Sequence, residues 1–173
     1  MTDQLDEAAQ ATLAQAAISI LTARGKTIAV AESLTGGLLV AALVSVPGAS
    51  AVVRGGVVAY ATPLKHSLLG VDGALLAEHG PVHPEVAAEM AEGVRETCAV
   101  DGVAADFGLA TTGVAGPDSQ DGKKPGTVFL GVSSGTGSRG VPLTLHGTRD
   151  EIRAATVEAA LRLLLDELTV ESE

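Results

Sequence analysis

A serine beside a glycine pair is the first candidate for nucleophilic chemistry in this chain. In ESLTGG (32–37), Glu32 ends an apolar stretch and Ser33 stands where we predict a turn into a helix with Gly36 in its first turn. Free N–H groups at a helix start favour anions or a developing oxyanion. A simpler role stays open, because Ser33 or Thr35 is also a typical helix N-cap.

A lysine follows the second predicted strand region. The segment YATPLK (60–65) contains Tyr60, the only tyrosine of the chain, and Lys65. A lysine at the edge of an apolar sheet can lose its charge by desolvation, and it can then deprotonate a serine that the fold brings near. The alternative for Lys65 is an ordinary solvated surface lysine.

Two further segments could bind a ligand. TTGVAGP (111–117) ends a predicted strand in small residues, and the carboxyl ends of strands are where α/β folds place ligands, although an ordinary loop has the same composition. In HGTRDEIR (146–153), Thr148 is the predicted N-cap of the last helix and Arg149 opens it. Arg149 could hold a phosphate or pair with an acidic neighbour.

Other motifs are interpreted as structural. GTGSRG (135–140) fits the letters of a dinucleotide-binding loop, but a strand rather than a helix follows it, which favours a hairpin. The four histidines and the one cysteine form no compact ligand set, so no metal site is predicted. Cys98 closes a predicted helix among valines, which favours inert packing over a nucleophile.

Composition narrows the classes of function. The 173 residues suit one domain; they are 46% hydrophobic and only 2% aromatic, with a formal net charge of −10. An acidic chain without stacking aromatics argues against nucleic-acid binding. A single cysteine indicates a reducing compartment. The acidic start resembles no signal peptide, and the apolar run 36–48 is too short to cross a bilayer, so we expect a cytoplasmic protein without membrane contact.

The order of predicted elements favours an α/β fold. Helices and strands alternate at first, and two strands then follow each other directly, which indicates a single domain with a mixed β-sheet covered by helices. Helices are expected at 6–24, 33–46, 63–69, 72–79, 83–98 and 149–168, and strands at 27–32, 50–62 with a bend at its two glycines, 105–113, 127–133 and 140–146.

Taken together, the motifs resemble a known family. AESLTGG, PGAS, GGVVAYATPLK, HGPVHPEVAAEMAEG, TTGVAGP, KPGTV and GTRDEIR, in this order, are similar to the CinA C-terminal domain family, whose enzymatic members are nicotinamide-mononucleotide deamidases (PncC). The resemblance runs from about residue 26 to 168. Larger members carry an additional N-terminal domain related to molybdopterin-binding proteins, so this chain looks like the stand-alone form, with 1–173 as one domain.

The resemblance implies roles for individual residues. Ser33 matches the nucleophile, Lys65 the lysine that assists it and Tyr60 a nearby catalytic tyrosine, which together form the expected catalytic set. The expected substrate-binding residues are Glu32, Thr35, Gly36, Ser50 of PGAS, Thr112, Gly113 and Arg149. The resemblance also implies a small nucleotide as substrate, no metal or redox cofactor, and a homo-oligomer.

The implied reaction is hydrolysis of the carboxamide of nicotinamide mononucleotide to nicotinate mononucleotide and ammonia. The alternative is a non-catalytic nucleotide-binding or regulatory protein linked to competence and DNA damage. A phosphoanhydride hydrolase ranks last, because the chain lacks a P-loop and a carboxylate cluster for Mg²⁺. Two departures from the family pattern, Asp118 and the shortened KPGTV loop, affect the expected substrate contacts.

Overall fold

The protein is built around one five-stranded mixed sheet. The computed structural model describes residues 2–170, with side chains from residue 8 onward. The strands run in the order β2–β1–β3–β4–β5; β2 and β3 flank β1 in parallel, whereas β4 and β5 are antiparallel additions. Their bounds are β1 Ile28–Glu32, β2 Val53–Val58, β3 Phe107–Gly113, β4 Thr127–Ser134 and β5 Gly137–Thr144. The predicted α/β fold with a mixed sheet is thereby confirmed.

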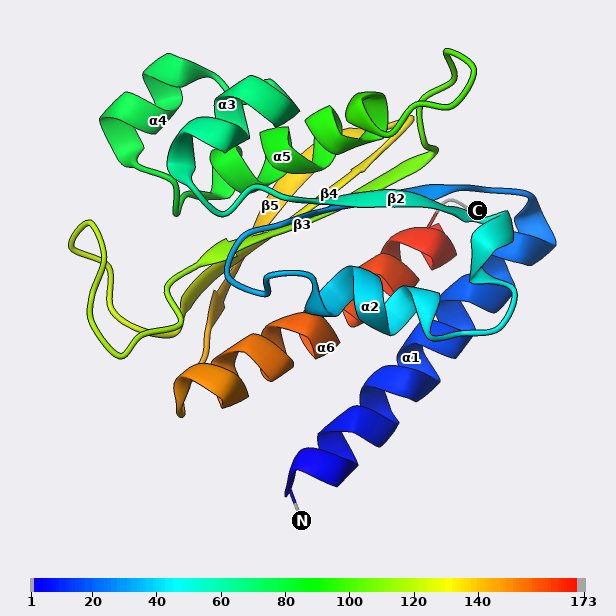
Figure 1. Cartoon of the computed structure of the whole chain (residues 1–173), viewed down its shortest axis with the longest axis horizontal. Helices are drawn as coiled ribbons and strands as arrows, with labels where there is room; N and C mark the ends of the chain where they lie inside the picture. Colours follow the sequence, from blue (N-terminus) through cyan, green and yellow to red (C-terminus); the bar gives the residue numbers. More distant parts are fainter. Residues whose placement is uncertain (1, 171–173) are drawn as a thin grey trace.

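Helices cover both faces of the sheet (Figure 1). α3, α4 and α5 lie on one face, and α1, α2 and α6 lie on the other. Their bounds are α1 Thr2–Arg24, α2 Leu38–Val44, α3 Thr62–Leu69, α4 Gly73–His79, α5 Pro84–Thr97 and α6 Arg149–Val170, with a short 3-10 helix η1 at Ala49–Ala51. None of the helices within residues 2–170 is both long and apolar enough to cross a membrane.

The interior strand β1 separates two aliphatic cores. Side chains of a strand alternate between faces. Accordingly, Ile28 and Val30 pack in the larger core with α1, α2 and α6, whereas Ala29 and Ala31 pack in the smaller core beneath α5. All four are fully buried. The small residues on the second face let α5 approach the sheet closely.

Glycines on three neighbouring strands set that close approach. A Cβ atom added at Gly108, Gly131 or Gly140 would lie 1.8, 1.8 or 2.1 Å, respectively, from a backbone oxygen of α5. No other residue fits at that separation, so the backbone of α5 packs directly on β3, β4 and β5. This packing explains how the core closes with almost no aromatic side chains.

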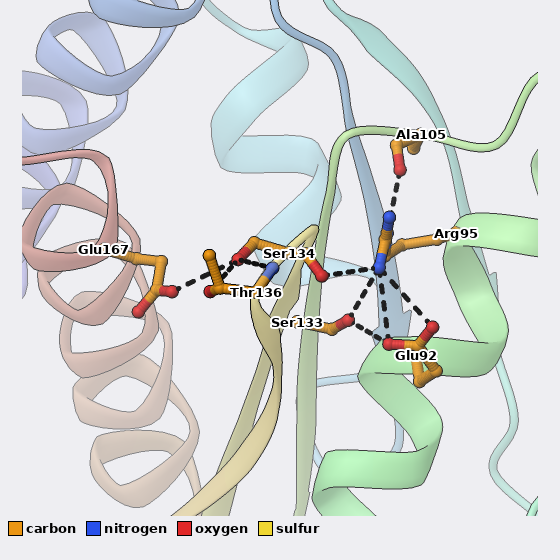
Figure 2. A network of polar contacts seen from close by, with 7 residues as sticks. All are labelled: Glu92, Arg95, Ala105, Ser133, Ser134, Thr136 and Glu167. Carbon is orange, nitrogen blue, oxygen red and sulfur yellow. Dashed lines mark hydrogen bonds and ion pairs between the residues drawn. The ribbon is translucent and has the colours of Figure 1, made fainter. Parts of the chain in front are cut away.

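A polar network fastens α5 to β4 at one end of the sheet (Figure 2). Nη1 of Arg95 donates to Ser133 Oγ at 3.1 Å and to the Ser134 carbonyl at 2.8 Å, and its Nε donates to the Ala105 carbonyl. The Ser133 hydroxyl donates to the carboxylate of Glu92. Ser133 is fully buried, so this serine–carboxylate pair holds elements together and has no access to a substrate.

Three differences between predicted and observed elements concern the sheet or the site. Of the one or two strands expected in 50–62 the structure has one, β2, which contains both glycines; a Cβ at Gly56 would lie 3.0 Å from the Val40 side chain, so a larger residue does not fit there. β5 begins at Gly137, since a two-residue turn joins it to β4; this confirms the predicted hairpin at 135–140. The third difference, the start of α2, concerns the candidate site directly.

Candidate active site

A pocket opens where the parallel strands end. Ser33 follows the last residue of β1, and Thr112 and Gly113 close the neighbouring strand β3. The pocket encloses about 160 Å³ and is open to solvent, so it is smaller than the ~300–1,000 Å³ typical of small-molecule sites. Its lining is Ser33, Leu34, Tyr60, Thr62, Lys65, Pro81, Val82, Thr112, Gly113, Val114, Ala115, Gly116, Asp118, Gln120 and Arg149.

Ser33 and Lys65 meet inside this pocket. The Nζ atom of Lys65 lies 2.9 Å from Oγ of Ser33 and 2.8 Å from the carbonyl oxygen of Ala59. The serine comes from the turn after β1, and the lysine comes from the first turns of α3, which has Pro63 near its start. The Ser33 N–H donates to the Thr111 carbonyl at 3.0 Å, which fixes the nucleophile's backbone against β3.

Burial changes the acidity of Lys65. The side chain is 1% exposed, and no carboxylate is recorded within salt-bridge distance of it among the described residues. Desolvation lowers its pKa from 10.5 to about 8, because a buried ammonium loses its hydration. More of Lys65 is therefore a neutral amine near physiological pH than of a solvated lysine. A neutral amine can donate one hydrogen to Ala59 and accept the hydroxyl hydrogen of Ser33, so the geometry suits a general base.

The turn after Ser33 is not helical, which corrects the predicted helix at 33–46. Gly36 and Gly37 have φ values of 60° and 105°, a left-handed conformation that ends helical geometry and favours glycine. α2 therefore begins only at Leu38. The first helical turn, which we expected to carry the oxyanion-binding N–H groups, lies beyond this bend.

The carboxylate of Glu32 binds the N–H groups at the start of α2. Its buried carboxylate accepts hydrogen bonds from the N–H groups of Gly37 at 3.0 Å, Leu39 at 3.1 Å and Val40 at 2.8 Å. Glu32 thus stabilises the start of α2 in place of the predicted substrate contact. The N–H groups at the observed start of α2 are therefore not free to bind an oxyanion, because they already have a charged partner.

Three other predicted binding residues lie outside the pocket. Thr35 is fully buried and exchanges a 2.8 Å hydrogen bond with Thr111. Gly36 lies beside the guanidinium of Arg153. Ser50 is exposed in η1, which precedes β2; since β1 and β2 are parallel, η1 is at the opposite end of β1 from Ser33. Within one chain, Ser50 does not reach the pocket.

Thr112 and Gly113 do line the pocket, as the sequence indicated. The hydroxyl of Thr112 donates to the Pro81 carbonyl at 2.7 Å, and the side chain is 1% exposed. Its observed contact is therefore with the segment between α4 and α5, whose residues Pro81 and Val82 form one wall of the pocket. Thr112 positions that wall at the end of β3.

Arg149 and Tyr60 form the rim of the pocket. At the start of α6, Arg149 donates from Nη1 to the Gly116 carbonyl at 2.8 Å and from Nη2 to the Tyr60 hydroxyl at 3.2 Å. The predicted N-cap Thr148 accepts from the Glu151 N–H, and Glu151 accepts from the Thr148 N–H, so the helix starts at a capping box. The Tyr60 hydroxyl pairs with Arg149, whereas Lys65 contacts Ser33 directly.

Sequence reasoning missed part of the pocket wall. Thr62 and Gln120 line it; Thr62 lies inside the YATPLK segment, where only Tyr60 and Lys65 were singled out, and Gln120 belongs to no segment whose spacing indicates chemistry. Asp118, noted as a departure from the family pattern, also lines it and brings a negative charge. The glycine-rich composition of 114–126 predicts a loop here, but the direction of its side chains depends on the turns that the loop makes.

The cysteine and the histidines take no part in this site. Burial raises the pKa of the Cys98 thiol, which keeps it protonated and agrees with the predicted inert packing. Within residues 2–170, no group of three or more His, Cys, Asp or Glu side chains is arranged to hold a metal ion.

Comparison with known proteins agrees with this architecture. Residues 10–168 match the profile of the CinA C-terminal domain. The chain belongs to the CinA C-terminal domain family. It is 48% identical over 147 residues, 85% of its length, to a CinA-like protein of Frankia casuarinae. It is 43% identical over 163 residues, 94% of its length, to a putative competence-damage inducible protein of a Geobacillus species.

Solved structures of CinA-related proteins share the fold. The competence/damage inducible protein CihA of Agrobacterium tumefaciens superposes with a TM-score of 0.85 at 35% identity, covering 93% of this chain and 96% of that one. A CinA superfamily protein of Escherichia coli superposes with a TM-score of 0.83 at 30% identity, covering 90% and 88%. By contrast, the chain spans 33% and 38% of the length of the two curated relatives, so it corresponds to about a third of those proteins.

Proposed function

We propose that this CinA-family chain hydrolyses the carboxamide of nicotinamide mononucleotide, giving nicotinate mononucleotide and ammonia. The observation that carries the proposal is the 2.9 Å contact between Lys65 Nζ and Ser33 Oγ in an open pocket. A serine is a weak nucleophile until a base takes its proton, and a desolvated lysine is one of the groups that can do so.

The first half of the reaction forms an acyl-enzyme. Neutral Lys65 takes the hydroxyl proton of Ser33 as Oγ attacks the amide carbon, and the carbonyl oxygen becomes an oxyanion. When the tetrahedral intermediate collapses, the C–N bond breaks and Lys65 returns the proton to the departing nitrogen. Ammonia leaves, and the nicotinoyl group remains as an ester on Ser33.

The second half restores the enzyme. Lys65 takes a proton from water as the water oxygen attacks the ester carbon, and a second tetrahedral intermediate forms. Its collapse breaks the bond to Ser33 Oγ, which recovers a proton from Lys65. The product is the nicotinate form of the mononucleotide, and both side chains return to their starting protonation states.

The pocket has groups that suit the remainder of this substrate. Arg149 at the rim brings a positive charge to an acidic protein, which a phosphate dianion needs. Two of its five N–H donors bind Gly116 and Tyr60, which leaves donors for phosphate oxygens. The exposed ring of Tyr60 and the carboxylate of Asp118 offer a flat surface and a negative charge to the cationic pyridinium.

A non-catalytic regulatory protein is the second candidate, since relatives are described as competence-damage inducible. A protein that only binds a ligand gains nothing from a buried lysine that contacts a serine and has no counter-ion, because burying such a charge lowers the stability of the fold. The Ser33–Lys65 pair therefore favours an enzyme.

Ammonia release separates the two candidates. The purified protein is incubated with nicotinamide mononucleotide, and ammonia and nicotinate mononucleotide are measured together. The proposal predicts equal amounts of both products, and it predicts that Ser33→Ala abolishes them while the protein stays folded. A folded wild-type protein that releases no ammonia would exclude the deamidase function.

We further propose a cytoplasmic homo-oligomer as the working form. Exposed apolar side chains on adjacent elements, Leu38 and Val44 on α2 and Val58 on β2, are compatible with self-association. Sedimentation of the purified protein tests this directly; a monomer at micromolar concentration would contradict it.

A further inference from the structure

The turn that carries the nucleophile leaves two backbone donors without a partner. Among the N–H groups of residues 33–40, that of Ser33 donates to Thr111 and those of Gly36 and Leu38 donate to carbonyls inside the turn. Those of residues 37, 39 and 40 donate to the Glu32 carboxylate. For Leu34 and Thr35, no acceptor is recorded among the described residues, although both residues are buried.

Buried N–H groups are nearly always paired, so these two need an explanation. They belong to the two residues immediately after Ser33; Leu34 lines the pocket, whereas Thr35 is fully buried outside it. An N–H group at the pocket beside a nucleophile can bind a developing oxyanion. The N–H groups at the start of α2 cannot do so, because they bind Glu32.

Arg153 of α6 holds the other side of the same peptide groups. Its Nε donates to the Leu34 carbonyl at 3.0 Å, and its Nη2 donates to the Thr35 carbonyl at 3.1 Å. In a trans peptide the C=O and the following N–H point in opposite directions. By holding two consecutive carbonyls toward α6, Arg153 fixes the orientation of the peptide planes in the turn after Ser33.

A hydrogen bond inside the turn fixes the N–H of Leu34. The Ser33 carbonyl accepts from the Gly36 N–H at 3.1 Å, so the N–H of Leu34 is directed away from that bond. The Arg153 guanidinium lies over Gly36, whose added Cβ would be 3.6 Å from Nη2. The planar guanidinium can span two carbonyls, which a single ammonium does less well.

We propose that the N–H of Leu34 binds the developing oxyanion, and that Arg153 is the positioning residue that holds the turn in which this N–H lies. Arg153 is not in the pocket lining, so it acts through the turn rather than on the substrate. The inference deepens the proposed amide hydrolysis and rests on Ser33 as its nucleophile, but it concerns any reaction in which Ser33 attacks an electrophile and builds negative charge on oxygen.

The test compares Arg153→Met, which removes the donors, and Arg153→Lys, which keeps the charge. The control is Arg162→Met on the same helix, since Arg162 makes an exposed ion pair with Glu158 and does not contact the turn. A second control, Asp150→Asn, removes only the exposed acidic partner of Arg153. Thermal unfolding of every variant is measured alongside.

Two readouts separate this inference from the proposed substrate. The first is the rate at which a fluorophosphonate modifies Ser33, followed by mass spectrometry: Oγ attacks phosphorus, fluoride leaves, Lys65 takes the proton, and the phosphoryl oxygen carries the developing charge. The second is kcat and KM for nicotinamide mononucleotide. A positioning error of this kind costs about 10- to 100-fold in rate.

We expect Arg153→Met to lower the labelling rate and kcat by that factor, with KM and the pH midpoint near 8 unchanged because Lys65 is untouched. Arg153→Lys should recover part of the loss, and both controls should match the wild type. If Arg153→Met is labelled more slowly but the wild type releases no ammonia from nicotinamide mononucleotide, the proposed substrate is refuted and the oxyanion assignment stands.

Three results would overturn the assignment. The first is unchanged labelling in Arg153→Met. The second is a wild type whose Ser33 resists the probe above pH 8. The third is a loss of rate that follows the unfolding temperature across both Arg153 variants, because such a loss reflects the fold rather than the turn.

Discussion

Lys65 Nζ lies 2.9 Å from Ser33 Oγ, although the two residues are 32 positions apart in the chain. Ser33 follows the carboxyl end of β1. Lys65 lies on α3, which follows the carboxyl end of β2, the parallel neighbour of β1. Each residue alone has an ordinary interpretation, as an N-cap or a surface lysine. Their contact in a pocket gives them a shared chemical role.

Replacing Lys65 by arginine should remove catalysis although the positive charge stays. A guanidinium does not lose its proton in the accessible pH range, so it cannot take one from Ser33. We expect kcat for ammonia release to fall by about 100- to 10,000-fold, the usual contribution of a general base, in both Lys65→Arg and Lys65→Met. Lys26→Arg, at an ion pair with Asp106, is the matched control and should keep full activity. An active Lys65→Arg variant would show that only charge is required.

The pH dependence of kcat/KM should report the titration of Lys65. Desolvation lowers its pKa to about 8, and only the neutral amine accepts the serine proton. Activity should therefore rise as pH increases through about 8 and then reach a plateau. The measurement is kcat/KM for ammonia release between pH 6 and 10. A profile that is flat or falls across pH 8 would mean that Lys65 acts in its protonated form.

Stability should depend on the same titration, with a sign that follows from linkage. Between the folded-state pKa of about 8 and the unfolded value of 10.5, the unfolded chain binds a proton at Lys65 that the folded protein does not. The free energy of unfolding therefore rises with pH across this window, by on the order of 3 kcal/mol in total. Lys65→Met lacks this contribution.

Denaturant unfolding of wild type and Lys65→Met at pH 7 and pH 10.5 measures that difference. The two proteins share all other titrating groups, so the change in their difference isolates Lys65. The wild type should gain stability relative to the variant as pH rises. A constant difference would show that Lys65 keeps an ordinary pKa in the folded protein.

Arg149 should discriminate the mononucleotide from the riboside that lacks its phosphate. A charge-assisted hydrogen bond contributes about 1.5–3 kcal/mol, which is roughly 10- to 150-fold in kcat/KM. Arg149→Ala should lose this factor for nicotinamide mononucleotide and change little for the riboside. Arg139→Ala, at an exposed ion pair with Glu167, is the matched control. Equal losses on both substrates would place the phosphate elsewhere, with Thr112 and Gly113 as the next region to test.

Local signals in the sequence predicted much of the fold. The unbroken apolar run of β1 indicates a strand buried on both faces, as observed. The start of α5 at Pro84 was also predictable; its N-cap is His83, whose Nδ1 accepts from the Glu85 N–H. The start of α2 was misplaced because Ser33 is a favoured cap, whereas the actual partner of the helix N–H groups is Glu32. Two adjacent glycines before an apolar run were the available signal for that bend.

The candidate site was predictable in residue type but not in arrangement. Motifs indicated Ser33, Lys65 and Arg149, and the structure brings all three to one pocket. The direct contact of Lys65 with Ser33, and of Tyr60 with Arg149, depends on how α3 and α6 pack on opposite faces of the sheet. Ser50 was expected to bind substrate because of its PGAS motif. The parallel pairing of β1 and β2 instead places it at the amino end of β1, opposite the end that carries Ser33.

The central claim is that Ser33 forms an ester with the substrate after Lys65 takes its proton. The direct measurement is acid quenching of the wild type during turnover of nicotinamide mononucleotide, followed by mass spectrometry of the peptide that contains Ser33, with parallel reactions in hydroxylamine. The account predicts a nicotinoyl-ribotide adduct on Ser33, or its capture as the hydroxamate, and neither in Ser33→Ala. Steady ammonia release that yields neither adduct nor hydroxamate would contradict it.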